Sequence, residues 1–171
     1  MSNTTRTPAL SDAEQTRLDE RRATLRERYI SAADTAGAAP PVATAGVDHL
    51  ALICSDIERT VRFYTEVVHM HLTKVVANRD DPSSTHVFLD MGGGNLLAFF
   101  DFPRHGPGKT VRGIGAMHHL ALKASAAQYQ QIIKDLRALD IEHDIHGDAE
   151  RGSVYFRDPD GILLEITTGY D

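Results

Sequence analysis

The sequence predicts an α+β fold in which two β-α-β-β-β modules pair, preceded by an N-terminal helical arm. Three observations support this prediction. The tetrapeptide His-Leu-Ala-Leu occurs at residues 49–52 and again at 119–122, so the chain carries a weak internal repeat. Each copy is followed by a segment with the apolar periodicity of a helix, and each helix by three strand-like stretches. Neither module could close a core alone, so we expect the two to pair around a shared concave surface.

The N-terminal segment differs in composition from the rest of the chain. Residues 11–30 are rich in strong helix formers and alternating charges, and their apolar stripe is thin. This pattern predicts a solvated helix that lies on the surface, with a subunit clamp or a pocket lid as the alternative. The next stretch is rich in Ala, Gly and Pro, which is typical of a linker. The predicted divisions are an arm and linker at 1–45, a domain at 46–171, and modules at about 46–102 and 116–168.

The same start signal precedes both predicted helices. Ser55 and Glu58 have the spacing of a capping box, in which the Ser side chain accepts a hydrogen bond from a backbone amide of the first turn. Ser125 and Gln128 repeat this spacing in the second module. Apolar residues then recur at the period of one buried helix face. They are Ile57, Val61, Tyr64 and Val68 in the first helix, and Tyr129, Ile132, Ile133, Leu136 and Leu139 in the second.

Strand-like stretches of similar length follow each helix. They lie at 72–77, 86–90 and 95–102 in the first module, and at 141–145, 153–156 and 162–168 in the second. The last two stretches of each module are joined by turn sequences, Gly92–Gly94 and Asp158–Gly161. Four phenylalanines lie in or next to the strands of the first module, and we expect them to fill the core, with the lining of a pocket for an aromatic ligand as the alternative. They are Phe88, Phe99, Phe100 and Phe102.

Composition argues against several classes of partner. The 171 residues include 18 basic and 24 acidic side chains, so the formal charge is −6, which gives no basic surface for nucleic acid. No stretch approaches the ~18 consecutive apolar residues of a membrane span. The single cysteine, Cys54, cannot form an internal disulfide, and the N-terminus does not resemble a secretory signal. We therefore expect a cytoplasmic protein whose nine histidines are its unusual feature.

The repeat singles out two of these histidines. His49 and His119 stand at equivalent positions near the start of each module. Glu165 lies in an apolar strand, where an uncompensated carboxylate costs several kcal/mol. Two imidazoles and one carboxylate are the ligand set of a catalytic metal with open coordination positions. The alternative is that both histidines are satisfied core residues and that the carboxylate points outward.

Three motifs carry a resemblance to a known superfamily. They are Asp-His-Leu-Ala-Leu at 48–52, His-His-Leu-Ala-Leu at 118–122, and Val-Tyr-Phe-Arg-Asp-Pro-Asp-Gly-Ile-Leu-Leu-Glu at 154–165. In these motifs the chain resembles the vicinal oxygen chelate superfamily, which includes glyoxalase I, bleomycin- and fosfomycin-resistance proteins and type I extradiol dioxygenases. The resemblance implies paired modules that form an open barrel around a divalent metal ion. It does not imply one reaction.

One position favours a reaction within the superfamily. Residues 95–98 align with residues 162–165, which places Ala98 in the slot where glyoxalase I and related epimerases usually carry Glu or Gln. Extradiol dioxygenases and fosfomycin-modifying enzymes leave this slot empty. An open coordination sphere suits a catecholate and O₂ sharing one ion. The resemblance therefore favours an extradiol-type dioxygenase, an oxidoreductase acting on a catechol-like aromatic diol, with Fe(II) preferred and Mn(II), Ni(II) or Zn(II) as alternatives.

A second match to the extradiol dioxygenases involves two further residues. Their signature places a His before an aliphatic residue and Tyr, then Asp-Pro-x-Gly and Glu. His146, Tyr155 and Glu165 stand at the matching positions, although Asp144 departs from the usual pattern. The resemblance implies that His146 moves a substrate proton and that Tyr155 hydrogen-bonds the bound oxygen. The alternatives are a surface-loop histidine and ordinary strand packing.

Two rival functions remain open at this point. One is a metal-dependent lyase, isomerase or thiol transferase, similar to glyoxalase I or a fosfomycin-modifying enzyme. The other is a metal-free binding protein of the bleomycin-resistance kind. In each case we expect a small-molecule ligand and a homo-oligomer, a dimer or larger, with the modules pairing within one chain or between two.

Overall fold

The computed structural model describes residues 10–29, 44–103, 108, 110, 111, 113–148 and 150–169. The chain divides into two units, Met1–Gly46 and Val47–Asp171. Among the residues that the structure describes, no helix combines the length and the apolar character needed to cross a membrane.

Helix α1, Asp12–Tyr29, belongs to the first unit. It begins after Ser11, whose backbone amide and hydroxyl both donate to Oε2 of Glu14, at 2.9 and 2.6 Å. None of its residues is buried. This confirms the predicted solvated helix, because a thin apolar stripe offers no face to bury. Most of the predicted linker, residues 30–43, lies outside the described residues.

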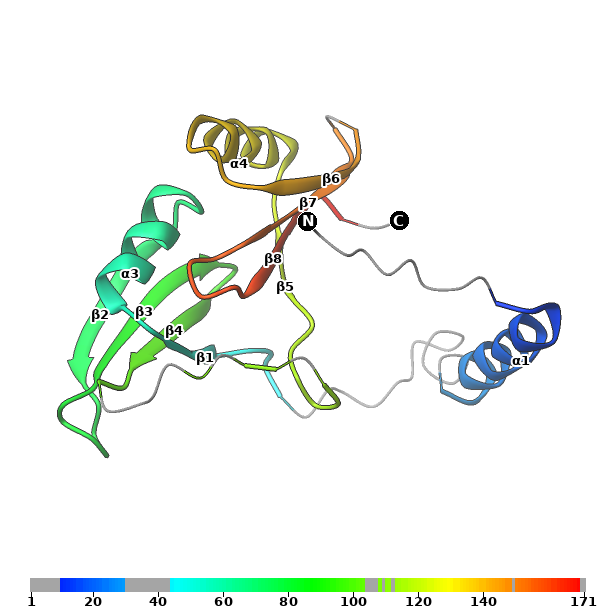
Figure 1. Ribbon diagram of the computed structural model, residues 1–171, viewed down its shortest axis with the longest axis horizontal. Coiled ribbons are helices and arrows are strands. Elements are labelled where there is room, and N and C mark those ends of the chain that lie inside the picture. The colour runs from blue at the N-terminus through cyan, green and yellow to red at the C-terminus, as the bar shows by residue number, and fades with distance from the viewer. Residues whose placement is uncertain are drawn as a thin grey trace. The chain divides into compact units, whose positions relative to one another are not determined.

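Module 1 is one four-stranded sheet with one helix (Figure 1). Its elements are β1 (His49–Cys54), α3 (Ile57–Glu66), β2 (His71–Ala77), β3 (Thr85–Gly92) and β4 (Asn95–Asp101). The strand order is β1-β4-β3-β2; β1 runs parallel to β4, and the other pairs are antiparallel. The predicted turn joins β3 to β4, and its three glycines have the positive φ angles that favour glycine.

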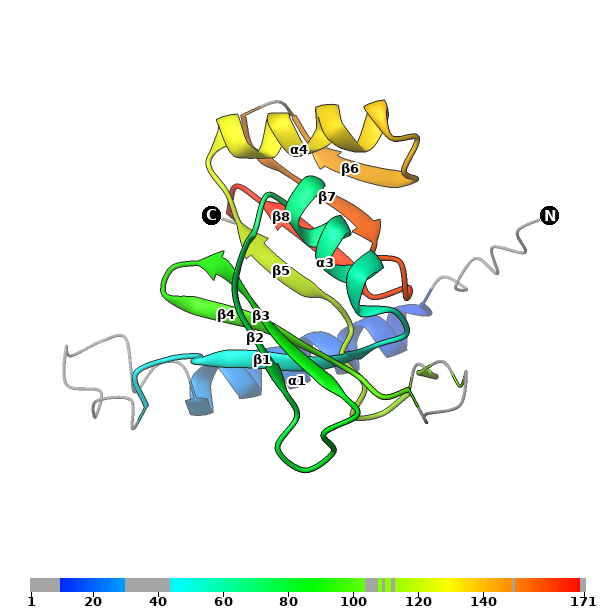
Figure 2. The ribbon, with the colours of Figure 1, turned by 90° about the vertical axis from the view of Figure 1, so that its left-hand side faces the viewer.

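Module 2 repeats this arrangement, and Figure 2 shows each sheet with its helix. Its elements are β5 (Leu120–Lys123), α4 (Ala126–Ala138), β6 (His143–Gly147), β7 (Gly152–Arg157) and β8 (Leu163–Thr167). The strand order is β5-β8-β7-β6, the same as in module 1. The predicted α+β class and the two β-α-β-β-β modules are thus confirmed. The described strands form two separate sheets, so the barrel around a metal ion stays a prediction.

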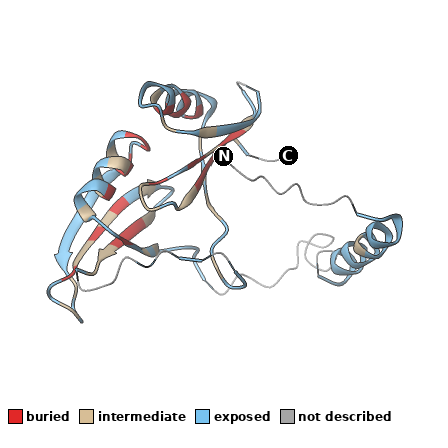
Figure 3. Cartoon of the chain, viewed as in Figure 1, coloured by how far each residue is buried: buried red, intermediate tan, exposed pale blue. Residues whose placement is uncertain are grey.

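The hydrophobic core forms where each helix packs on its sheet, and the buried residues lie mainly on these elements (Figure 3). Tyr64 of α3 is fully buried against Phe99, with ring centroids 4.9 Å apart. Tyr129 and Leu136 of α4 are also fully buried. Leu139, predicted on the same face, is instead 56% exposed, because the helix ends at this residue.

The two helix starts differ from one another. The capping box of Ser125 and Gln128 is confirmed, with both reciprocal hydrogen bonds present. The capping box predicted at Ser55 is wrong, because Asp56 is the N-cap residue of α3 and accepts a hydrogen bond from the Arg59 amide at 2.9 Å. Ser55 instead donates through its amide and its hydroxyl to the carboxylate of Asp160 in module 2. A contact distant in sequence thus replaces the local cap.

A buried hydrogen bond also links the two modules. The Tyr64 hydroxyl donates to Oδ2 of Asp158 at 3.2 Å, which joins α3 to the turn between β7 and β8. Burial raises the pKa of Asp158, and the backbone amides of Ile162 and Asp160, which donate to its other oxygen, partly oppose this effect. The Asp-Pro-Asp-Gly turn is therefore part of the contact between the modules.

The confirmed capping box gives a direct stability prediction. Replacing Ser125 with Ala should lower the free energy of unfolding by about 1 kcal/mol, because the first turn of α4 loses its side-chain acceptor. Urea denaturation followed by circular dichroism measures this loss. A Ser125→Asp variant retains an acceptor at the N-cap and should recover most of it. Equal stability of the Ala variant and the unchanged protein would contradict the role of the cap.

Candidate metal centre

Glu165 is a buried carboxylate on the sheet face of module 2 that α4 does not cover. The residue is 1% exposed. Its strand neighbours Leu164 and Ile166 belong to the hydrophobic core on the other face, because successive strand residues alternate sides. Ala121 of β5 and Tyr155 of β7 are the register partners of Glu165. We call this side of the sheet, which carries Glu165, Ala121 and Tyr155, the open face of module 2.

His119, the residue just before β5, meets Glu165. Its Nε2 lies 2.8 Å from Oε2 of the carboxylate. Two donors that each lie about 2.0–2.2 Å from one ion are about 3 Å apart, so the pair fits a shared divalent cation. Nδ1 of His119 lies 2.6 Å from Nδ1 of His118, which orients the ring from its other side. Two of the three predicted metal ligands are thus brought together.

The two predicted catalytic residues lie on the same open face. The ring of Tyr155 lies edge-on to that of His119, with centroids 6.0 Å apart. The ring of His146 lies edge-on to that of Tyr155 at 5.5 Å, and His146 is exposed. Four of the five predicted site residues therefore form one continuous cluster from β8 to β6.

His49, the fifth predicted residue, lies in module 1. Its Nδ1 is 2.7 Å from Oδ1 of Asp48, and its ring lies 5.8 Å from that of Phe88. No group of three His, Cys, Asp or Glu side chains placed to hold a metal ion occurs within the part of the chain that the structure describes. Within one chain, the ligand set is therefore split between the two modules.

The strand register supports the predicted equivalence of Ala98 and Glu165. In module 1, Ala51 of β1 pairs with Ala98 of β4, and in module 2 Ala121 of β5 pairs with Glu165 of β8. Ala98 therefore occupies the position of the carboxylate in the other module, and its methyl group offers no ligand.

A row of rings, which the sequence pattern did not predict as a row, lies on the matching face of module 1. The row runs His49, Phe88, His86, Phe100 and Phe102, with successive centroid distances of 5.8, 4.1, 3.6 and 5.8 Å. We call these five residues the aromatic row. The prediction that the phenylalanines fill the core is confirmed for Phe99 but wrong for Phe88, Phe100 and Phe102, which are partly exposed. Side chains alternate between the two faces of a strand, and this alternation in β3 and β4 could have distinguished the core-facing phenylalanine from the others.

His86 is held in the middle of this row as a flat, weakly solvated ring. Its Nε2 is buried and has no hydrogen-bond partner among the described residues. Burial lowers the pKa of His86, with smaller contributions from the nearby His49 and Lys74. The neutral imidazole is therefore favoured, which suits stacking against Phe100.

This shift predicts how stability depends on pH. The unfolded chain binds a proton at His86 more readily than the folded chain, so the free energy of unfolding should fall as the pH drops below about 6.5. His86→Phe should remove this contribution and flatten the profile. Urea denaturation between about pH 5 and 8 measures the difference between the two proteins. An identical pH dependence in both would contradict the assignment.

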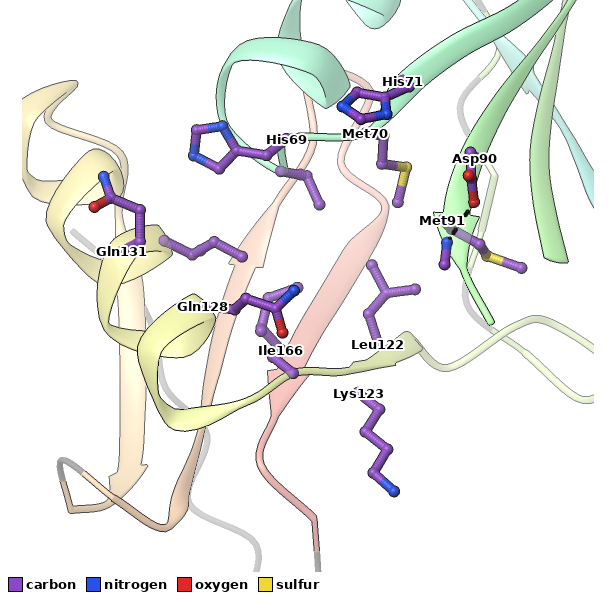
Figure 4. A pocket seen from close by; sticks show the side chains of 14 residues that line it. His69, Met70, His71, Asp90, Met91, Leu122, Lys123, Gln128, Gln131 and Ile166 are labelled. Carbon is purple, nitrogen blue, oxygen red and sulfur yellow. Dashed lines mark hydrogen bonds between the residues drawn. The ribbon is translucent and has the colours of Figure 1, made fainter. Parts of the chain in front are cut away.

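A pocket of about 380 Å³ is lined by residues of both modules (Figure 4). His71 and Asp90 come from module 1, and Gln128 and Gln131 from α4. None of the five predicted site residues lines it. This pocket is therefore separate from the candidate metal centre.

Comparison with known proteins identifies one family. The model of the Glyoxalase/Bleomycin resistance protein/Dioxygenase superfamily matches residues 46–166. Among curated proteins, the chain is 26% identical over 127 residues to one from Bacillus subtilis (strain 168) named "Putative ring-cleaving dioxygenase MhqE". This match covers 72% of the present chain and 41% of the relative. The chain thus spans about two fifths of the length of that relative.

Solved structures show the same fold. A glyoxylase/bleomycin resistance protein/dioxygenase domain from Frankia sp. EAN1pec has a TM-score of 0.64 at 19% identity, covering 74% of this chain and 99% of that one. A mutant of the fosfomycin resistance protein FosX from Listeria monocytogenes, complexed with Mn(II) and 1S,2S-dihydroxypropylphosphonic acid, has a TM-score of 0.58 at 20% identity. That match covers 74% of this chain and 94% of FosX.

Proposed function

The chain belongs to the glyoxalase/bleomycin resistance protein/dioxygenase superfamily, and from this premise we propose that it is an extradiol-type dioxygenase. Its substrate would be a catechol-like aromatic diol. The observation that carries the proposal is the contact between buried Glu165 and His119, on a face whose counterpart in module 1 has Ala98 at the carboxylate position. The name of the curated Bacillus relative supports the same reaction.

The proposed ligands of the divalent ion are His49, His119 and Glu165. Fe(II) is the preferred ion for two imidazoles and one carboxylate, with Mn(II), Ni(II) and Zn(II) as alternatives. The Mn(II) complex of FosX supports a divalent cation in this fold. When bound, the ion would supply a positive centre for the diol oxygens and a redox path to O₂. Three protein ligands leave room for substrate because Ala98 contributes none.

We propose that a second copy of this chain supplies the missing histidine. Within one chain, His49 lies beside Phe88 in module 1, whereas His119 and Glu165 meet in module 2. In a twofold dimer, the open face of module 2 in each copy would receive His49 from the other. Such an arrangement gives two equivalent sites, because a twofold axis repeats every contact.

Tyr155 and His146 are the residues proposed to handle the substrate proton. Tyr155 is the register partner of Glu165, so its hydroxyl is suited to hydrogen-bond a diol oxygen held beside that carboxylate. The His146 ring lies next to the Tyr155 ring and is exposed to solvent. Imidazole can accept a proton from the diol and return it to the product near neutral pH.

The proposed reaction is balanced without an external reductant. Both atoms of O₂ enter the diol, and the ring bond between one hydroxyl-bearing carbon and its neighbour without a hydroxyl group breaks. The product is a ring-opened hydroxy acid with an aldehyde or ketone group.

A direct assay tests the proposal. Protein loaded with Fe(II) without air should, after O₂ is admitted, consume one O₂ per catechol and form a yellow ring-opened product. His146→Ala should lower kcat by about 10²-fold or more, as expected for loss of an acid–base group. O₂ uptake and visible absorption follow both quantities. A panel of catechols that gives neither O₂ uptake nor yellow product with metal-loaded protein would exclude ring cleavage.

The FosX match favours one second candidate, a metal-dependent addition to a small electrophile. Mn(II)-loaded protein incubated with fosfomycin, with and without glutathione, should then turn over without consuming O₂. Consumption of O₂ separates the two functions, since only ring cleavage depends on O₂.

A further inference from the structure

The aromatic row of module 1 is not required by the fold. In the strand register, Phe88 and Ala98 of module 1 correspond to Tyr155 and Glu165 of module 2. One step along the same face, the pair His86 and Phe100 corresponds to the pair Ser153 and Thr167. At this second pair, module 2 builds the same sheet with hydroxyl groups where module 1 has rings.

The two sets of side chains are packed differently. The hydroxyl groups of Ser153 and Thr167 are buried and lie 2.9 Å apart, so they satisfy one another. His86 and Phe100 are stacked at 3.6 Å with an interplanar angle of 18°, and both remain partly exposed. Module 1 thus presents a flat, partly exposed ring surface where module 2 presents a closed polar contact.

A cation lies beside this surface. Nζ of Lys74 is 5.2 Å from the centroid of the Phe88 ring, within the range of a cation–π contact. No carboxylate pairs with Lys74 among the described residues. Rings beside a cation that none of the described carboxylates neutralises suit a planar aromatic anion, whose ring stacks while its charge meets the ammonium group.

We propose that the aromatic row is the ring-recognition surface of this enzyme, and that it selects a planar aromatic diolate over an acyclic chelator. The row begins at His49, one of the proposed metal ligands, so a ring held at the metal would lie at its end. This inference rests on the proposed function. Phe100 and Phe88 are the residues that determine specificity, and Lys74 contributes by its charge.

Two probes separate recognition of the ring from chelation of the metal. 4-Nitrocatechol carries a ring and vicinal oxygens, whereas acetohydroxamate chelates through vicinal oxygens without a ring. Both are titrated into Mn(II)-loaded protein without O₂, by visible absorption and by calorimetry. Phe100→Leu keeps an apolar side chain but removes the ring. It should raise the Kd for 4-nitrocatechol about five- to tenfold and leave the Kd for acetohydroxamate unchanged.

Two further variants complete the design. Lys74→Met should raise the Kd for 4-nitrocatechol at a pH where the probe is ionised, and this effect should shrink at high salt. Val75→Ala is the matched control, since Val75 is an exposed aliphatic residue of the same strand outside the aromatic row, and it should change neither Kd. Thermal denaturation checks that each variant folds, and metal analysis checks that each holds the same amount of Mn(II).

The possible outcomes distinguish this inference from the proposed function. An unchanged Kd for 4-nitrocatechol in Phe100→Leu, with metal content and acetohydroxamate binding intact, would refute the proposed ring surface. It would not contradict the proposed metal centre. If EDTA-treated protein takes up no metal but still binds 4-nitrocatechol in a way that depends on Phe100, the ring surface would be supported and the proposed dioxygenase function would be excluded. A Phe100→Leu protein that changes its oligomeric mass but not its probe affinity would identify the row as a contact between copies and refute the inference.

Discussion

Replacing Glu165 with Gln is expected to weaken divalent metal binding by more than about 100-fold and to remove O₂-dependent turnover. Loss of a group that merely supports a ligand already costs about 10–100-fold in metal affinity, and loss of the ligand itself should cost more. Glutamine keeps the size of the side chain and its ability to hydrogen-bond His119. The variant should therefore fold, so that the metal loss can be read directly from elemental analysis and calorimetry.

Stability measurements show whether the loss of metal comes from the loss of the carboxylate charge and not from a less stable fold. The metal-free Glu165→Gln protein should unfold within about 1 kcal/mol of the metal-free parent, because removing a buried charge offsets any loss of packing. Glu142→Gln is a matched control at an exposed carboxylate of module 2, and it should keep full metal content. Retention of stoichiometric Fe(II) or Mn(II) by Glu165→Gln would exclude Glu165 as a ligand.

Mixing two inactive variants is expected to restore metal binding. His49→Ala and Glu165→Gln should each lose the ion when purified alone. A mixed dimer, however, has one site in which both changes meet and one site in which neither occurs. Random exchange makes about half of the dimers mixed, so about a quarter of all sites should recover metal and activity.

The amount of recovery discriminates between the two arrangements of modules. If each site were built within one chain, every site would carry one of the two changes and mixing would restore nothing. The measurement is metal content and O₂ uptake after the variants are unfolded together, refolded, and compared with each variant refolded alone. Native mass spectrometry of the mixture should show a dimer containing both chains, and a protein that is monomeric throughout would contradict the proposed second copy.

Local sequence patterns predicted most of the secondary structure. The spacing of Ser125 and Gln128 placed the start of α4 correctly, because a capping box involves atoms within one helical turn. The equal pattern at Ser55 failed because Asp160, 105 residues away, binds Ser55 instead. Spacing alone could not reveal that competitor.

In the candidate site, too, some features could be predicted from the sequence and others could not. Equivalence within the repeat correctly aligned Ala98 with Glu165, since both modules have the same strand order and register. The core prediction is wrong for Phe88, Phe100 and Phe102, because apolar character alone does not specify the side of the strand on which a residue lies. In β4, Phe99 points into the core and Phe100 to the opposite face, although they are neighbours in sequence.

The modules, their helix and strand order, and the residue types available as metal ligands could thus be predicted from the amino-acid sequence. These features depend on apolar period, turn residues and an internal repeat, all of which act over short stretches of chain. The folded structure was needed to show that His119 and Glu165 meet, that His49 lies in the other module, and that five rings form a row. These contacts depend on strand register and on how the two modules pack, which join residues far apart in sequence and are not specified by local spacing.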